Sequence, residues 1–233
     1  MISLTGVKHV SFDLWLTLIK SHSAFKRERS NLLKRYFHVQ QNEEAVFNTV
    51  TRFDRLFNTI NETTGGNAET SAIVLVILDA LGVQTQTITR QQLDGFYAEM
   101  EEQFFKYPPL LLHNEIPGCL QHLQRSGITI SLLSNTAFIK GATLRKYLEQ
   151  AGLAGYFHFQ LYSDELGYSK PNPRVFEALY AEAQAIRSLK KNELLHIGDN
   201  ATADYEGALG AGLQALLVKN DGSDWPELFR ETG

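Results

Sequence analysis

Two aspartates, Asp13 and Asp199, each stand at the end of an apolar stretch of the sequence. Neither has an obvious partner of opposite charge beside it in the sequence, so placing both carboxylates in one crevice would cost electrostatic repulsion. A divalent cation removes that repulsion. Mg²⁺ prefers hard oxygen ligands, usually one or two carboxylates together with phosphate oxygens and water. The pair therefore predicts a metal site with Mg²⁺ as the cofactor.

A hydroxyl, an amide and a lysine could hold an anion beside those carboxylates. Ser134 and Asn135 follow a third apolar stretch, and their side chains, with nearby backbone N–H groups, can bind an anion. Lys170 precedes a proline in a short loop, which makes it a fixed positive charge suited to a phosphate or to Asp13 itself. We therefore expect Ser134, Asn135 and Lys170 to bind substrate.

Each of these groups also has a structural interpretation. An aspartate after a strand often caps a helix or forms a turn, and Ser134-Asn135 by itself is typical of a turn. Lys170 by itself fits a solvated loop. Their order, and their common place after apolar stretches, favours a functional site.

Alternating apolar stretches and amphipathic segments predict the elements that position these residues. We expect strands at 7–14, 128–133, 156–162, 194–197 and 215–218. We expect helices at 116–125, 142–151, 173–185 and 205–211. Strands that alternate with helices imply an α/β fold with a parallel sheet covered on both faces, whose sites lie at the carboxyl ends of the strands.

The stretch from about residue 20 to residue 107 has a different pattern. Its apolar residues recur at helical spacing, and two prolines, Pro108 and Pro109, end the last helical segment. We expect an all-helical domain at 20–107, inserted into an α/β core domain formed by 1–19 and 108–233.

Four motifs in this order resemble the haloacid dehalogenase-like superfamily. They are FDLWLTLI with Asp13 and Thr17, LLSNT with Ser134, YSKPNP with Lys170, and GDNATADYEGALGAG with Asp199 and Asp204. The resemblance extends from Asp13 to Gly212, and the fourth motif is the most specific. It implies a Rossmann-like core, and the helical insert resembles that family's cap domain.

The resemblance also implies a covalent mechanism on a small-molecule substrate. Asp13 would attack the substrate and form an aspartyl intermediate that water then hydrolyses. Mg²⁺ would be held by Asp13, by the backbone carbonyl of Trp15 and by Asp199. Asp204 would support the metal shell or position Lys170. Ser134 and Lys170 would bind the transferring group and so act in catalysis with Asp13.

Trp15 departs from the pattern of the family's phosphatases, which carry an acid/base aspartate at that position. Indole cannot shuttle protons at neutral pH. In one hypothesis the protein is still a phosphohydrolase that acts on a small organic phosphate. Its substrate then has a good leaving group, or a residue of the cap supplies the proton. His22 and Lys26 are candidate proton donors, although a solvated helix start also explains both.

Two other hypotheses remain open. The 2-haloacid dehalogenases carry an aromatic residue at the Trp15 position, but Asp199 and Asp204 depart from their pattern. Such an enzyme also needs an arginine for the substrate carboxylate, and the candidates are Arg27, Arg29 and Arg35. Alternatively, the chain is a phosphate-binding module with little turnover.

Composition limits the remaining classes of function. The 233 residues carry a formal net charge of -4 at pH 7, which does not favour nucleic acid or an anionic membrane as partner. Cys119 is the single cysteine, so no internal disulfide can form, and the N-terminal stretch does not fit a signal peptide. We expect a cytoplasmic protein, and the sequence leaves its oligomeric state open.

Overall fold

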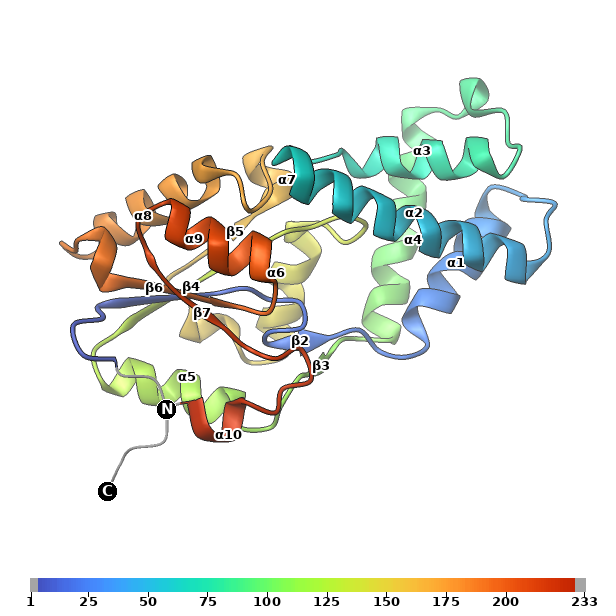
Figure 1. The fold of residues 1–233 in the computed structure, drawn as a ribbon. Helices are drawn as coiled ribbons and strands as arrows, with labels where there is room; N and C mark the ends of the chain where they lie inside the picture. Colours follow the sequence, from blue (N-terminus) through green and yellow to red (C-terminus); the bar gives the residue numbers. More distant parts are fainter. Residues whose placement is uncertain (1–3, 229–233) are drawn as a thin grey trace.

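A computed structural model of the chain describes residues 4–228, which fold around a five-stranded sheet (Figure 1). In their order across the sheet the strands are β5 (Phe159–Tyr162), β4 (Thr129–Ser134), β1 (His9–Phe12), β6 (Leu194–Gly198) and β7 (Gln214–Leu217). All neighbouring pairs are parallel. The expected α/β class with a Rossmann-like parallel sheet is confirmed.

Helices cover both faces of this sheet, which explains why its central strands are apolar runs. All residues of β1 and β6 are buried. Figure 1 shows α8 and α9 on one face and α5 and α10 on the other. The helices of this part of the chain are α5 (Ile116–Arg125), α6 (Gly141–Gln150), α7 (Ser163–Leu166), α8 (Pro173–Ile186), α9 (Gly207–Gly210) and α10 (Trp225–Leu228).

The strand order brings the predicted site residues to one edge of the sheet. The central strand β1 lies between β4 and β6 and pairs with both in parallel. Asp13 follows β1, Ser134 ends β4 and Asp199 follows β6. Three adjacent strands therefore end in polar residues at the place where ligands bind in open parallel sheets.

Four further helices, which we call the helical unit (residues 25–106), lie beside the sheet (Figure 1). They are α1 (Phe25–Tyr36), α2 (Glu43–Thr64), α3 (Thr70–Ala80) and α4 (Arg90–Lys106), with a 3₁₀ turn at Thr85–Thr87. Asn42 caps the start of α2 by accepting a hydrogen bond from the backbone N–H of Ala45. Gly65 ends that helix with φ at 66°, a left-handed conformation that favours glycine.

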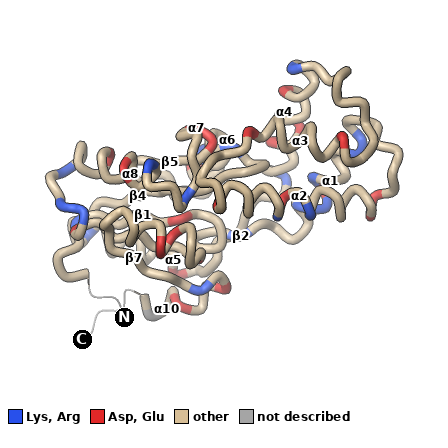
Figure 2. The backbone as a smooth tube through the Cα atoms, turned by 45° about the horizontal axis from the view of Figure 1, so that its top comes forward, with Lys and Arg blue, Asp and Glu red and all other residues tan. Residues whose placement is uncertain are grey.

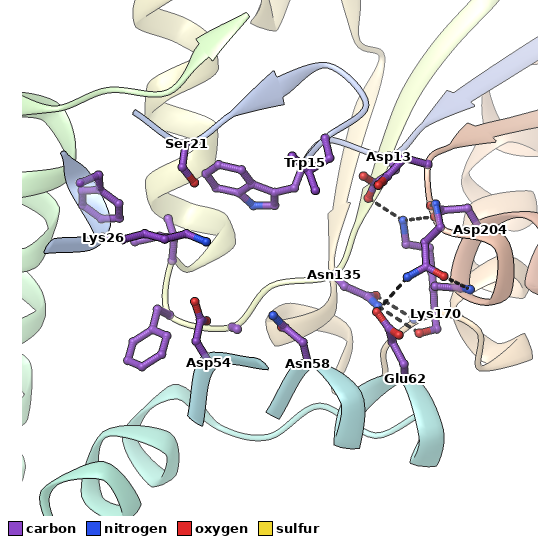
Figure 3. A pocket seen from close by; sticks show the side chains of 18 of the residues that line it. Asp13, Trp15, Ser21, Lys26, Asp54, Asn58, Glu62, Asn135, Lys170 and Asp204 are labelled. Carbon is purple, nitrogen blue, oxygen red and sulfur yellow. Dashed lines mark hydrogen bonds and ion pairs between the residues drawn. The ribbon is translucent and has the colours of Figure 1, made fainter. Parts of the chain in front are cut away.

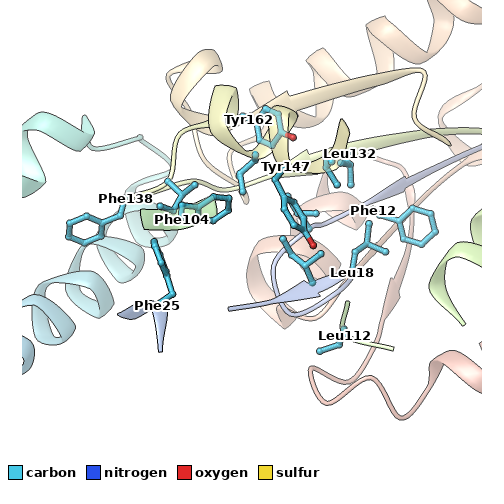
Figure 4. Packing of buried hydrophobic residues seen from close by; sticks show 14 of the residues in the cluster. Phe12, Leu18, Phe25, Phe104, Leu112, Leu132, Phe138, Tyr147 and Tyr162 are labelled. Carbon is cyan, nitrogen blue, oxygen red and sulfur yellow. The ribbon is translucent and has the colours of Figure 1, made fainter. Parts of the chain in front are cut away.

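A short antiparallel ribbon of β2 (Ile19–Lys20) and β3 (Leu110–Leu111) carries the two connections to the helical unit. The apolar core runs through it without interruption, from Phe12 in the sheet past Leu18 and Leu112 to Phe25 and Phe104 in the helices (Figure 4). The expected boundary between residues 19 and 20 falls inside β2, and the boundary between 107 and 108 falls between α4 and β3.

Two predicted elements differ from the structure. The helix expected at 205–211 begins instead with a π-helical turn at Ala201–Glu206, which α9 continues. The Asn200 side chain accepts the backbone N–H groups of Thr202 and Ala203 and so starts the helix earlier. The strand expected at 156–162 is shorter, because a 3₁₀ turn occupies Ala154–Tyr156 and β5 begins at Phe159.

Charges of both signs are interspersed along the sheet-forming part and the helical unit (Figure 2). Within residues 4–228, no helix combines the length and the apolar character needed to cross a membrane.

Candidate active site

A buried lysine forms the centre of the site. The Lys170 Nζ atom lies 2.6 Å from Asp13 Oδ1 and 2.6 Å from Asp204 Oδ1, and it donates a third hydrogen bond of 2.8 Å to the backbone oxygen of Leu133. Lys170 is 1% exposed, so these three acceptors replace its hydration. The structure thus brings Asp13, Lys170 and Asp204 together, as predicted from their motifs.

Asn135 fixes the backbone that carries this lysine. Its Nδ2 donates to the carbonyl of Lys170 at 3.0 Å, and its Oδ1 accepts from the Lys170 backbone N–H at 2.8 Å. Asn135 also lines the cavity described below. Its amide is engaged with the lysine loop, a positioning contact that the sequence did not indicate.

Two neighbours complete the surroundings of Asp204. His196 is fully buried, with Nε2 3.1 Å from Asp204 Oδ1. The backbone N–H of Asn200 donates to Asp204 Oδ2 at 3.0 Å. Gly198 leaves the room for this carboxylate, because a Cβ atom there would lie 2.2 Å from it. Both oxygens of Asp204 are therefore occupied by protein donors.

One lysine cannot balance three carboxylates, and their pKa values reflect this. Although burial acts to raise it, Lys170 and His196 hold the pKa of Asp204 below its usual range. Burial raises the pKa of Asp13 to about 7, against the lowering effect of Lys170 and with a further contribution from Asp204. Burial and Asp204 raise the pKa of Asp199 to about 6. Asp13 and Asp199 are thus the two carboxyls whose negative charge the protein compensates least.

The donor set fits a hard divalent cation. Carboxylate oxygens of Asp13, Asp199 and Asp204 all lie within 4.8 Å of one another. Because both oxygens of Asp204 already accept hydrogen bonds, Asp13 and Asp199 are the residues with oxygens left for direct coordination. Oxygen ligands of this number and charge suit Mg²⁺.

A cavity of about 320 Å³ opens above these residues and has two walls (Figure 3). The core wall consists of Asp13, Asn135, Lys170, Asp199 and Asp204. The helical wall consists of residues of α1 and α2, namely Lys26, Arg29, Asp54, Asn58 and Glu62. Trp15 lines the cavity beside Asp13 (Figure 3).

The other predicted residues have varied positions. Ser134 is 1% exposed, its hydroxyl donates to the carbonyl of Asn135 at 3.3 Å, and it is not among the residues that line the cavity. Of the two candidate proton donors, Lys26 lines the cavity, whereas the ring of His22 accepts from the N–H of Ala24 and contacts Tyr107.

Arg29 is the arginine that lines the cavity, among the three considered from the sequence. It is buried, pairs with Asp54 at 3.2 Å and lies 4.1 Å over the ring of Phe138. Its Nε atom has no hydrogen-bond partner among the described residues. The sequence did not distinguish it from Arg27 and Arg35, because burial of an arginine depends on the packing of distant segments.

Known proteins resemble this chain in sequence and in fold. The haloacid dehalogenase-like hydrolase family matches residues 7–212. Phosphoserine phosphatase of Thermus thermophilus is 34% identical over 124 residues, which are 52% of this chain and 46% of that protein, so the chain spans less than half of that relative. (S)-2-haloacid dehalogenase 2 of Pseudomonas sp. is 22% identical over 224 residues, 95% of this chain and 88% of that protein.

The fold is also that of a solved structure, the HAD-hydrolase YfnB from Bacillus subtilis bound to magnesium. The two superpose with a TM-score of 0.64 over 97% of this chain and 90% of that one, at 19% sequence identity. At this identity the likeness concerns the fold.

Proposed function

The chain belongs to the haloacid dehalogenase-like hydrolases, and we propose that within this family it is a Mg²⁺-dependent phosphohydrolase of a small organic phosphate. One observation carries this proposal: the buried Lys170 lies among three clustered carboxylates, of which Asp13 and Asp199 follow adjacent strands and Asp204 lies in the helical turn after β6. Such a site has surplus negative charge for a cation, and the cation attracts a phosphate. The phosphatase relative agrees with it.

Asp13 acts as the nucleophile in this proposal. Lys170 holds its Oδ1, and Oδ2 has no hydrogen-bond partner among the described residues, which leaves Oδ2 to attack phosphorus. Attack forms an aspartyl phosphate and releases the alcohol, and water then cleaves the phosphate from Asp13. Lys170 favours the ionised form of the nucleophile and orients it, because its three hydrogen-bond donors are fixed by Asp13, Asp204 and Leu133.

The remaining core residues bind and orient. Asp13, Asp199 and the Trp15 backbone carbonyl would hold Mg²⁺, with Asp204 supporting the site through Lys170. Bound Mg²⁺ supplies positive charge to the phosphoryl oxygens. Ser134 and Asn135 would assist in binding the transferring group, Ser134 after rotation of its hydroxyl away from the Asn135 carbonyl.

We further propose that residues 20–107 work as a cap on a core formed by 1–19 and 108–233. The cavity lies between the core wall and the helical wall, so a substrate held at Asp13 would extend toward α1 and α2. Closure would exclude water and set specificity.

A second candidate is 2-haloacid hydrolysis. Arg29 favours it, because a buried arginine with an unpartnered donor at the cavity could hold a carboxylate. The dehalogenase relative, which matches 95% of this chain, agrees with it. Halide leaves without a proton, so Trp15 would be no loss.

A substrate screen separates these candidates. Phosphate release from a panel of phosphomonoesters and halide release from 2-haloacids are each measured with Mg²⁺ and with EDTA. The proposal expects phosphate release that requires Mg²⁺ and is absent in Asp13→Asn. Metal-independent halide release would support the second candidate. Tight phosphate binding without release of product would indicate a binding module.

A further inference from the structure

We propose that Glu62, on the helical wall, is the proton donor and acceptor that Trp15 cannot be. This inference rests on the proposed phosphohydrolase function. Glu62 would give a proton to the leaving alcohol and then take one from the attacking water, from the side of the cavity opposite Asp13.

The end of α2 that carries Glu62 is fastened to the loop that carries Lys170. Gly65 accepts hydrogen bonds at its carbonyl from the Ser169 backbone N–H at 3.1 Å and from Asn172 Nδ2 at 3.0 Å. Asn67 Oδ1 accepts from the hydroxyls of Ser163 and Ser169 at 2.7 and 3.3 Å. Figure 1 shows this end of α2 beside α7. Contacts one turn beyond Glu62 thus hold the helix end on the core.

The carboxylate of Glu62 faces the core wall. Its Oε1 accepts a hydrogen bond of 3.0 Å from Nδ2 of Asn200, the residue that follows Asp199. Its Oε2 has no hydrogen-bond partner among the described residues. Glu62 is half-buried, lines the cavity and extends from α2 toward the residues of the core wall (Figure 3). One oxygen is therefore oriented and the other is left for a substrate.

The other groups of the helical wall are less suited to proton transfer. Asp54 is already occupied by its ion pair with Arg29 at 3.2 Å. Guanidinium groups are not deprotonated in proteins, which excludes Arg29 as the group that exchanges a proton. Lys26 is exposed and has no partner among the described residues to orient its ammonium group. Glu62 is the remaining carboxyl of this wall.

The chemistry balances with Glu62 in this role. As Asp13 Oδ2 bonds to phosphorus, the bond from phosphorus to the leaving oxygen breaks, and that oxygen takes the proton of the Glu62 carboxyl. Water then attacks phosphorus while the bond from phosphorus to Asp13 breaks, and the Glu62 carboxylate takes the proton of the water. The enzyme returns to its starting state, with one alcohol and one phosphate released.

The test compares Glu62→Gln with the wild type on an alkyl phosphate and on p-nitrophenyl phosphate. Glutamine can keep the hydrogen bond from Asn200 but cannot donate an acidic proton. The expected kcat falls about 10²–10⁴-fold on the alkyl ester, the contribution of general acid catalysis, and much less on p-nitrophenyl phosphate, whose leaving group needs no proton. Asp54→Asn is the matched control, and its effect should be the same on both esters.

Rescue adds a second readout. In the Glu62→Gln background, Trp15→Asp restores a carboxyl beside Asp13 and should recover rate on the alkyl ester more than on the nitrophenyl ester. Circular dichroism and Mg²⁺ titration confirm that each variant is folded and binds metal. An equal loss on both esters, or none, in a folded Glu62→Gln protein overturns the role of Glu62 alone. A wild type that hydrolyses no phosphate ester overturns this role and the proposed function together.

Discussion

The core wall and the helical wall face the same cavity but are built in different ways. On the core wall Lys170 and Asp204 are 1% and 2% exposed, and all their polar atoms have partners in the protein. On the helical wall the Lys26 ammonium group has no partner among the described residues, and Arg29 Nε and Glu62 Oε2 are likewise unpartnered. On the core wall the Lys170–Asp204 network is satisfied within the protein and oxygens of Asp13 and Asp199 are left for a cation, whereas the helical wall has side-chain groups left for a substrate.

This difference separates two tasks. A closed network at strand ends can hold the proposed nucleophile and the proposed Mg²⁺ in fixed geometry, which catalysis requires. Unpartnered groups on helices can bind whatever the substrate carries beyond its phosphate. Substitutions on the core wall should therefore affect the chemical step and stability. Those on the helical wall should affect the choice of substrate, except at Glu62, for which a part in the chemical step is proposed.

The largest effect is expected for Asp13→Asn. Loss of the nucleophile should lower kcat by on the order of 10⁴-fold or more, as for nucleophiles in other covalent enzymes. Stability should not fall in EDTA, because the amide carries no charge to be desolvated or repelled by Asp199 and Asp204. Steady-state kinetics measures the fall in kcat, and urea unfolding in EDTA measures the stability. Substantial residual turnover would mean that another group attacks the substrate.

The next effect is on stability and compares one lysine from each wall. Lys170→Met leaves Asp13 and Asp204 buried without their cation, and removing one partner of such a network costs about 3–5 kcal/mol. Lys26→Met, at an exposed position, should change the free energy of unfolding by less than about 0.5 kcal/mol. Urea denaturation in EDTA measures both. Equal effects would contradict the difference between the walls.

The contrast also explains what the sequence could predict. Strand ends are marked by apolar runs that stop at polar residues, so the parallel sheet and the approach of Lys170 to Asp13 could be predicted from local patterns. The place of Asp204 beside Lys170 was implied only by the family resemblance of its motif. The positions of Arg29 and Glu62 did not, because they depend on how α1 and α2 pack against distant segments. The local sequence of such a helix does not distinguish a charged residue that is buried from one that is exposed.

Two residues at or near the core wall make contacts that the sequence did not indicate. Asn135 was expected at the substrate; it lines the cavity, and its amide also holds both backbone groups of Lys170. His196 was given no role, and it lies against Asp204. Asn135 and Lys170 are 35 residues apart in the sequence, and His196 and Asp204 lie on the two sides of the turn after β6, so spacing alone does not indicate either contact.

A smaller effect is expected in the pH dependence of metal binding. The pKa values of Asp13 and Asp199 are raised to about 7 and about 6, so both carboxyls gain protons as the pH falls through these values. Mg²⁺ must displace those protons, and its dissociation constant should rise by up to about tenfold per pH unit for each proton displaced. Isothermal titration calorimetry from pH 8 to pH 5 measures this, with Asp54→Asn as a control that leaves the trend intact. A constant affinity over this range would place the metal elsewhere.

The most direct test of the central claim is the fate of the phosphoryl group. The protein is mixed with Mg²⁺ and a phosphate ester that it hydrolyses, quenched in acid during turnover and digested for mass spectrometry. The account predicts a phosphoryl group on Asp13 that is absent from the Asp13→Asn protein and from the sample with EDTA. Turnover with the phosphoryl group on another residue, or with none detected on the protein, would contradict it.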